Sequence, residues 1–193
     1  MSNPSITKIA DRLYLGDSKS SRDRKILGEH NITAVVSLSG GQWVHWSQPW
    51  YKEIIPEGNH LFRKCEDSMT QDLLPELADI CDFIKQRLDS GSGSVLVHCD
   101  RGVSRSATAV IAYLMQTYQY DLATALAFVG GKRRIKPNEN FKEQLEVWGA
   151  VGGNVWAARG VPKPEYAVYL AKRTKRLQEA GLTGNEPVGV TSL

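Results

Sequence analysis

The sequence predicts an α/β domain, a three-layer sandwich in which a central, mostly parallel sheet of about five strands is flanked by helices. Short apolar runs such as residues 34–38 and 94–98 are typical of strands that are buried on both faces. These runs alternate with longer segments whose apolar residues recur at helical spacing. Hydrophobic residues make up 41% of the 193 residues and charged residues 23%, which is sufficient for one folded core.

The predicted elements follow one another along the chain in this alternating order. The expected strands are a short strand pair or edge at 6–15, then 34–38, 60–65 and 94–98. The expected helices lie near 19–30, 73–89, 105–118, 121–128 and 137–148. Asp17 and Ser18 are expected to cap the first helix, and Asp72 the second.

Residues 42–58 carry Trp43, Trp46, Trp50 and Tyr51, and are expected to form an irregular loop or a short helix. Two interpretations remain open for these aromatic side chains. They either anchor the segment onto the core or form a rim beside a functional site.

The C-terminal part is predicted to differ from the rest. We expect one domain over residues 6–150, followed by an extension over 151–193. Within the glycine-rich stretch 149–162 we expect a linker, and then a basic helix over about 163–181 whose apolar stripe packs on the domain or binds a partner. A flexible tail is expected over the last dozen residues.

Composition narrows the class of protein. Three cysteines, Cys65, Cys81 and Cys99, form no disulfide framework and fit a reducing compartment, so we expect a cytoplasmic or nuclear location. The chain lacks a signal-peptide pattern and a long apolar run, and its histidines and cysteines lack zinc spacing. We therefore expect no membrane span, no metal and no cofactor, and we expect a monomer.

The net charge of +3 is not by itself a nucleic-acid signature, so no nucleic-acid partner is expected. Two basic clusters stand out, and each is either a solvated face or, for the first, part of the field around an anionic substrate. They are Lys132, Arg133, Arg134 and Lys136, and Lys172, Arg173, Lys175 and Arg176.

The most informative stretch is 97–106, Val-His-Cys-Asp-Arg-Gly-Val-Ser-Arg-Ser, between a buried strand and a helix. Backbone N–H groups and the helix dipole converge there, as they do where proteins bind phosphate. Cys99 in such a field is expected to have a lowered pKa and to serve as a nucleophile. Arg105 has the planar fork that holds two phosphate oxygens through a transition state.

The other residues of this stretch are expected to support these two. Gly102 lets the loop curl, and Ser106 can donate to the sulfur, although it can also serve only as a helix N-terminal hydroxyl. His98 is expected to orient the loop by hydrogen bonding, and Ser104 to do similar work. The expected phosphate-binding residues are Asp100, Arg101, Gly102, Val103, Ser104 and Arg105.

This stretch resembles the signature H-C-x(5)-R-[ST] of the protein tyrosine phosphatase superfamily. The serines and the following Ala-Tyr-Leu-Met run are similar to those of dual-specificity phosphatases of the atypical type. Two further segments are similar to segments of that family. They are Ile9–Gly16, and Arg-Arg-Ile-Lys-Pro-Asn over 133–138 with Phe141, Gln144 and Leu145, which is similar to the family's R-x-x-I-x-P-N-x-x-F-x-x-Q-L segment. Together they cover about residues 6–150 and imply the cysteine-dependent phosphatase fold, with Asn138 bracing the loop or simply capping a helix.

The resemblance implies a phosphocysteine mechanism with an Asp general acid on a loop upstream of the cysteine. Asp67 fits that position, and Asp72 is the alternative. Cys65 or Cys81 is a further candidate, as a disulfide partner of oxidised Cys99.

The chain departs from the family at Arg101, where relatives usually carry Ala, and Asp100 adds a negative charge. The acidic side chain argues against highly charged phosphoinositides, and the arginine argues for them.

Three functions follow from this resemblance. The first is hydrolysis of phosphotyrosine and phosphoserine or phosphothreonine in phosphorylated protein substrates, as in signalling. The second is hydrolysis of a non-protein phosphate, such as an RNA 5′ end or a phosphoinositide. The third is phosphopeptide binding without turnover, as in a pseudophosphatase.

Overall fold

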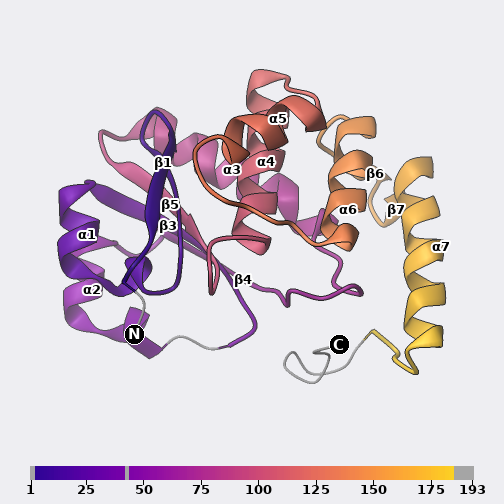
Figure 1. Cartoon of the computed structure of the whole chain (residues 1–193), viewed down its shortest axis with the longest axis horizontal. Coiled ribbons are helices and arrows are strands. Elements are labelled where there is room, and N and C mark those ends of the chain that lie inside the picture. The colour runs from indigo at the N-terminus through magenta and orange to yellow at the C-terminus, as the bar shows by residue number, and fades with distance from the viewer. Residues whose placement is uncertain (1–2, 42–43, 185–193) are drawn as a thin grey trace.

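The computed structural model describes residues 3–41 and 44–184, and its centre is a five-stranded sheet. The strands are β1 (Ile6–Ala10), β2 (Leu13–Gly16), β3 (Ile32–Ser39), β4 (His60–Lys64) and β5 (Ser94–His98). Their order across the sheet is β1-β2-β5-β3-β4, and only β1 runs antiparallel to its neighbour. The predicted fold class is confirmed, because the sheet is mostly parallel and lies between two layers of helices (Figure 1).

The central strand β5 is buried over its whole length, because both of its faces are covered. Val95 and Val97 belong to the larger apolar cluster, whereas Leu96 belongs to the smaller cluster on the opposite face. The alternation of side chains along a strand therefore joins both halves of the core at β5. This strand leads directly to Cys99, so the loop between β5 and α4 begins at a fully buried part of the sheet.

Helices cover both faces of the sheet (Figure 1). One face carries α1 (Arg24–Glu29) and α2 (Pro49–Ile54), each preceded by a short 3-10 helix, η1 (Ser20–Arg22) and η2 (Val44–Ser47). The other face carries α3 (Leu74–Ser90), α4 (Arg105–Tyr118), α5 (Leu122–Gly130) and α6 (Glu139–Ala150). Helix α4 is buried along most of its length, from Arg105 to Met115, so it forms the middle of this layer.

The single helix predicted over 19–30 is wrong, because the segment is divided into η1 and α1. Asp23 adopts an extended conformation between them, and its Oδ1 accepts hydrogen bonds from the amides of Lys25 (3.0 Å) and Ile26 (3.1 Å). Asp17, the predicted cap, accepts instead from the amide of Ser20 (2.8 Å) at the start of η1. A second capping residue within the segment therefore interrupts the helix.

The aromatic segment consists of η2 and α2, as the short-helix interpretation predicted. Tyr51 is buried in the smaller cluster, and Trp46 packs its ring edge-on against His60 of β4, with centroids 3.5 Å apart. These two side chains anchor the segment onto the sheet. Trp43 lies outside the described residues, and the interpretation of the segment as a rim stays a prediction.

The predicted linker at 149–162 is wrong. Val151 and Val155 are buried, and β6 (Trp156–Ala158) pairs with β7 (Val161–Pro162) in a small antiparallel hairpin. Glycines at positive φ supply its turns while the two valines join the core. Of the last dozen residues, for which a flexible tail is predicted, only 182–184 are among the described residues.

The final helix α7 (Pro164–Glu179) packs beside α6, at the end of the molecule furthest from α1 (Figure 1). Tyr166 and Tyr169 of α7 belong to the main apolar cluster. Glu143 of α6 pairs with Lys172 (3.0 Å) and with Arg176 (2.9 Å) of α7. The helix therefore packs on the domain, which is one of the two predicted options. Among the described residues, none of the helices has the length and apolarity that crossing a membrane requires.

Candidate active site

The loop between β5 and α4 surrounds the Cys99 sulfur with donors. The backbone amide of Gly102 lies 3.2 Å from Cys99 Sγ and donates to it, and Ser106 Oγ donates over 3.1 Å. Cys99 is only 2% exposed and Ser106 is fully buried. A backbone amide of the loop and a buried hydroxyl in the first turn of α4 therefore both donate to one sulfur.

Arg105 lies beside this sulfur at the first position of α4, with 5% of its surface exposed. Its Nη1 donates to the Cys65 carbonyl (3.0 Å), and its Nη2 donates to Asp100 Oδ2 (2.7 Å). Its buried Nε has no hydrogen-bond partner among the described residues. A buried guanidinium donor without a partner costs free energy unless a ligand satisfies it, which fits an anion site.

The charge on Arg105 is supported by its neighbours. Burial alone would lower the pKa of the guanidinium, but the hydrogen bond with Asp100 and the nearby Cys99 raise this pKa above its ordinary value. Asp100 itself is half exposed, with 51% of its side chain accessible. Its carboxylate therefore occupies a donor of Arg105 that a phosphate oxygen would otherwise use.

Gly102 adopts φ +66°, and a Cβ there would come within 2.4 Å of the Gly16 carbonyl oxygen. Only glycine suits both the left-handed backbone and this close approach of β2. Arg101 and Val103 contribute to the structure of the loop through their backbone carbonyls. The Arg101 carbonyl accepts from Arg133, and the Val103 carbonyl accepts from the amide of Lys136 (2.9 Å).

Arg133 braces the loop from outside, a role that the sequence analysis missed. Its Nε donates to the Gly102 carbonyl (2.7 Å), while Nη1 donates to the hydroxyls of Ser5 (3.0 Å) and Thr7 (3.1 Å). Partial burial lowers the pKa of this guanidinium. Its place in the family-like segment 133–138 was the available signal, but a bond to a backbone carbonyl has no residue pattern of its own.

Asp67 lies against the loop through one carboxylate oxygen. Its Oδ1 accepts from Ser104 Oγ (2.8 Å) and from Asn138 Nδ2 (2.8 Å). Its Oδ2 has no hydrogen-bond partner among the described residues, and the side chain is exposed. Asn138 is also the N-cap of α6, because its Oδ1 accepts from the amide of Phe141 (2.8 Å). The cap role of Asn138 is therefore present. Its side chain contacts the loop that carries Asp67, whereas only its backbone amide reaches the cysteine loop, at Ser104 Oγ (3.4 Å).

Asp72, the alternative acid, faces a different partner. Its Oδ2 accepts from the hydroxyl of Tyr166 in α7 (2.7 Å), and its Oδ1 accepts from the amide of Leu74 (3.1 Å). Leu73 occupies the N-cap position of α3, so Asp72 supports the helix start from one residue earlier than predicted. The contacts separate the two carboxylates, with Asp67 toward the cysteine loop and Asp72 toward the C-terminal helix.

His98 is fully buried at the end of β5, and its Nε2 lies 2.6 Å from Ser37 Oγ on the neighbouring strand β3. Ser37 Oγ in turn lies 3.0 Å from His60 Nε2 on β4. The expected structural role of His98 has a geometric basis here, because this chain ties three parallel strands together directly before Cys99.

The other two cysteines are buried and unpaired, as is Cys99. Burial raises the pKa of the Cys65 and Cys81 thiols well above the ordinary range, so both are neutral. In the sheet, β3 separates β4, which ends directly before Cys65, from β5, which leads to Cys99. Pairing of oxidised Cys99 with either thiol stays a prediction.

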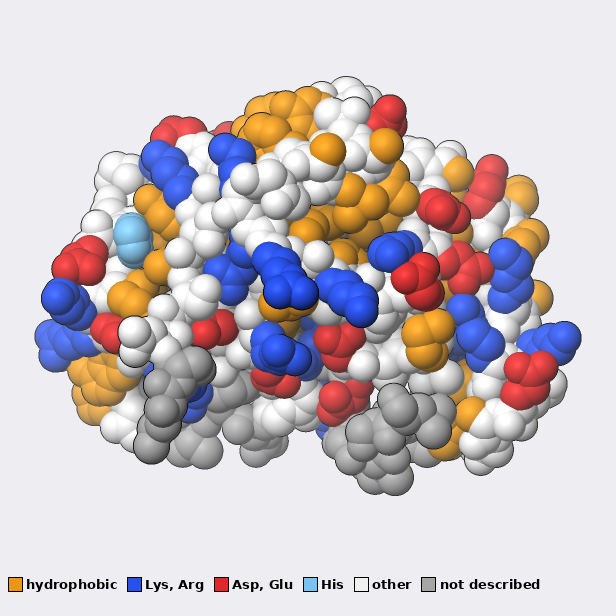
Figure 2. Space-filling view, in the orientation of Figure 1, with side chains coloured by type: hydrophobic (Ala, Val, Ile, Leu, Met, Phe, Trp, Pro, Cys, Tyr) orange, Lys and Arg blue, Asp and Glu red, His pale blue; other side chains and the backbone are white. Residues whose placement is uncertain are grey.

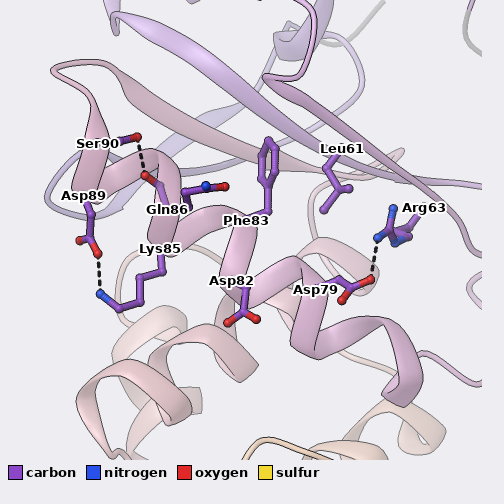
Figure 3. A pocket seen from close by; sticks show the side chains of 9 residues that line it. All are labelled: Leu61, Arg63, Asp79, Asp82, Phe83, Lys85, Gln86, Asp89 and Ser90. Carbon is purple, nitrogen blue, oxygen red and sulfur yellow. Dashed lines mark hydrogen bonds and ion pairs between the residues drawn. The ribbon is translucent and has the colours of Figure 1, made fainter. Parts of the chain in front are cut away.

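A pocket of about 830 Å³ lies away from the cysteine loop, between β4 and α3. Figure 3 shows that its polar side chains largely pair with one another, Lys85 with Asp89 and Arg63 with Asp79. It shares no residue with the loop around Cys99. Its size therefore does not identify it as the reactive site.

Basic side chains are exposed close to the cysteine loop. Figure 2 shows Lys and Arg side chains gathered near the middle of the face that it presents, with carboxylates beside them. Four residues of the loop and of the segment between α5 and α6 are exposed and basic, namely Arg101, Lys132, Arg134 and Lys136. The surroundings of the loop therefore favour anions.

The fold and the site define a class of protein, an α/β domain that presents a cysteine and an arginine in an anion-binding loop after its central strand. Residues 13–150 match the family model of the dual specificity phosphatase catalytic domain. The chain belongs to the dual specificity phosphatase family.

Individual relatives agree with this assignment. Mouse (Mus musculus) dual specificity protein phosphatase 26 is 36% identical over 133 residues, which are 69% of this chain and 62% of the mouse protein. The match thus spans less than two thirds of that relative's length. The crystal structure of the Yvh1 phosphatase domain from Chaetomium thermophilum superposes with a TM-score of 0.68 at 30% identity, covering 77% of this chain and 97% of that one.

A third relative carries a different description. The human tyrosine phosphatase-like serine/threonine/tyrosine-interacting protein superposes with a TM-score of 0.67 at 29% identity, over 76% of this chain and 96% of that one. The name of that protein describes it as phosphatase-like. Fold and family thus leave the activity of this chain to be argued from its own residues.

Proposed function

We propose that this protein hydrolyses phosphotyrosine and phosphoserine or phosphothreonine in protein substrates through a phosphocysteine intermediate. The observation that carries the proposal is the pair of donors aimed at Cys99 Sγ beside Arg105, whose Nε lacks a partner among the described residues. A nucleophile in a field of donors and a free guanidinium donor are the two parts that phosphoryl transfer requires.

In the first step, Cys99 Sγ attacks phosphorus and forms the S–P bond, while the bond from phosphorus to the ester oxygen breaks. Arg105 and the loop amides hold the phosphoryl oxygens as charge shifts among them. Asp67 gives its proton to the leaving oxygen. Its Oδ2 is suited to this, because Oδ1 is already held by Ser104 and Asn138.

In the second step, water attacks phosphorus, Asp67 takes its proton, and the S–P bond breaks to release inorganic phosphate. The electron pair of that bond returns to the sulfur, where the hydroxyl of Ser106 and the amide of Gly102 donate to the thiolate. The enzyme is then restored without any cofactor.

Two observations bear on the alternatives. The exposed basic residues around the loop keep a non-protein phosphate as a second candidate substrate. A pseudophosphatase would have no use for a complete set of nucleophile, guanidinium and acid, and this chain carries all three in Cys99, Arg105 and Asp67.

The test is phosphate release from a panel of substrates, with Cys99→Ser measured beside the wild type. The panel contains phosphotyrosine, phosphoserine and phosphothreonine peptides, a phosphoinositide and an RNA with a 5′ triphosphate. We expect turnover of the peptides that Cys99→Ser abolishes. Turnover confined to the lipid or the RNA would replace the substrate class, and phosphopeptide binding without turnover by the wild type would contradict the proposal.

A further inference from the structure

The C-terminal helix α7 contacts the segment that carries Asp67. We name residues 66–72 the acid loop. Arg173 Nε donates to the Thr70 carbonyl (2.7 Å), and the hydroxyl of Tyr166 donates to Asp72 Oδ2 (2.7 Å). Residues more than ninety positions later in the chain thus bind the backbone and a side chain of this loop.

Tyr169 reaches the acid loop through α6 as well. Its hydroxyl lies 3.0 Å from Asn140 Oδ1 and 3.4 Å from the Gln71 carbonyl. Asn140 is fully buried, and its Nδ2 donates to the carbonyls of Ser68 (3.1 Å) and Gln71 (2.7 Å). A tyrosine that donates to the amide oxygen holds the amide in the orientation that clamps the loop.

The acid loop contains no helix or strand of its own. Its internal bonds are few, and include those from the amides of Gln71 to Ser68 Oγ (3.1 Å) and of Glu66 to Gln71 Oε1 (3.0 Å). Asp67 is therefore held on one side by Ser104 and Asn138, and its loop is held on the other side by α6 and α7. If either side loosens, the carboxylate loses its position relative to Cys99.

Simple surface packing does not account for these contacts. The apolar faces of Tyr166 and Tyr169 and the ion pairs of Glu143 are sufficient to attach α7 to α6. The bond from Arg173 reaches a carbonyl of the acid loop. The bond from Tyr169 joins α7 to Asn140 of α6, and it also fixes the amide that donates to the loop. What they stabilise is the conformation of residues 68–71.

We propose that α7 holds the acid loop in its active conformation, and that Arg173 and Tyr169 are positioning residues for the general acid. The inference rests on the proposed function, because it requires that Asp67 donates the proton. It extends the active site beyond residue 150, where the family match ends. A displaced acid slows esters whose leaving oxygen needs a proton, and leaves esters of good leaving groups nearly unchanged.

The experiment compares Arg173→Gln and Tyr169→Phe with the wild type on aryl phosphates whose leaving-group pKa increases along the series. Tyr169→Phe keeps the ring packing and removes only the hydroxyl. The control is Lys172→Gln on the same helix, whose exposed side chain pairs with Glu143 and does not contact the loop. Thermal unfolding of every variant establishes that the fold is retained.

We expect kcat of Arg173→Gln and Tyr169→Phe to decrease by about 5- to 20-fold on the poorest leaving groups and by less than about 2-fold on the best. This loss is a fraction of what a general acid contributes. Hydrogen exchange at the amides of 66–72 should become faster in both. Lys172→Gln should behave as the wild type. Equal losses across the series, or no loss, would overturn the proposal.

Asp67→Asn, run on the same series, separates failure of this inference from failure of the proposed function. An inactive wild type, or an Asp67→Asn variant without leaving-group dependence, overturns the acid assignment and with it the positioning role. A normal Asp67 effect beside unchanged Arg173→Gln and Tyr169→Phe variants overturns the role of α7 alone. Faster loop exchange without any kinetic change also counts against the positioning role.

Discussion

The loop around Cys99 and the acid loop hold the two halves of the proposed chemistry in different ways. Residues 99–106 follow one strand and begin one helix, and their own amide and hydroxyl point at the sulfur. Residues 66–72 are held mainly by side chains of α6 and α7, which come much later in the chain. The nucleophile is thus organised locally, and the acid depends on tertiary contacts.

This difference has a physical reason. A phosphate loop uses backbone N–H groups of the loop and of the helix that begins directly after it, so the residues that it needs are close together in the chain. An acid must give up a proton at one point in space, so its loop needs support from several directions. We therefore expect changes in the cysteine loop to affect all substrates, and changes around the acid loop to affect substrates selectively.

The largest effect is expected from Arg105→Lys. Lysine keeps the charge but cannot offer two donors in a plane, so transition-state stabilisation should be lost. We expect kcat to decrease by about 10²- to 10³-fold on good and poor leaving groups alike. The control is Arg24→Lys, an exposed residue of α1 that pairs with Glu53. A loss that depends on the leaving group would contradict the distinction between the two loops.

Asp67→Asn should produce a smaller and selective loss. The amide oxygen can still accept from Ser104 and Asn138, so only the proton at Oδ2 is removed. We expect a decrease of about 10²-fold in kcat for phosphoserine peptides and a much smaller decrease for activated aryl phosphates. Steady-state kinetics on both substrates measures this contrast. If Asp72→Asn produced the contrast and Asp67→Asn did not, the acid would be the other carboxylate.

Asp100→Asn should strengthen anion binding. The carboxylate accepts from Arg105 Nη2 over 2.7 Å and places a negative charge beside the phosphate position. When that charge is removed, we expect the inhibition constant of inorganic phosphate to decrease by about 2- to 5-fold. The effect is this small because the carboxylate is half exposed and solvent screens its charge. Competitive inhibition at constant ionic strength measures it. Weaker binding in the variant would mean that Asp100 orients Arg105 more than it competes for it.

Asp72→Asn should change stability with a predictable pH dependence. Burial raises the pKa of Asp72, although the hydrogen bonds from Tyr166 and Leu74 lower it. A carboxyl with a raised folded pKa contributes full stability below its unfolded pKa of about 3.9, and that stability is lost as the pH rises through the folded pKa.

Asparagine stays neutral, and the hydroxyl of Tyr166 can accept from its amide. We therefore expect the variant to unfold about 1–3 °C above the wild type at neutral pH. This difference should disappear below about pH 4. Calorimetry across this range provides the measurement, and a difference that grew on acidification would reverse the sign of the argument.

The same difference between the loops explains what the sequence could predict. Cys99, Gly102 and Ser106 are neighbours in the chain, so their spacing alone indicated an anion loop, and the parallel sheet followed from short buried runs such as 94–98. The contacts of Arg133 and Arg173 could not be predicted, because each side chain donates to a backbone carbonyl, of Gly102 and of Thr70, and no residue type marks a carbonyl that accepts.

The errors in the predicted elements have equally local causes. Asp23 caps a second helix within 19–30, where the expected caps Asp17 and Ser18 indicated one continuous helix. The glycines of 149–162 resemble those of a linker, but Val151 and Val155 are buried and attach the hairpin to the domain. Glycine supplies turns in linkers and in packed hairpins alike, so composition does not distinguish them.

The central claim is that the phosphoryl group passes through the sulfur of Cys99. The most direct measurement is rapid acid quenching of the wild type during turnover of a phosphotyrosine peptide, followed by mass spectrometry of the digested protein. We predict one added phosphoryl group on the peptide that contains Cys99, and none in Cys99→Ala. Steady release of phosphate with no label on Cys99, or with label on another residue, would contradict the account.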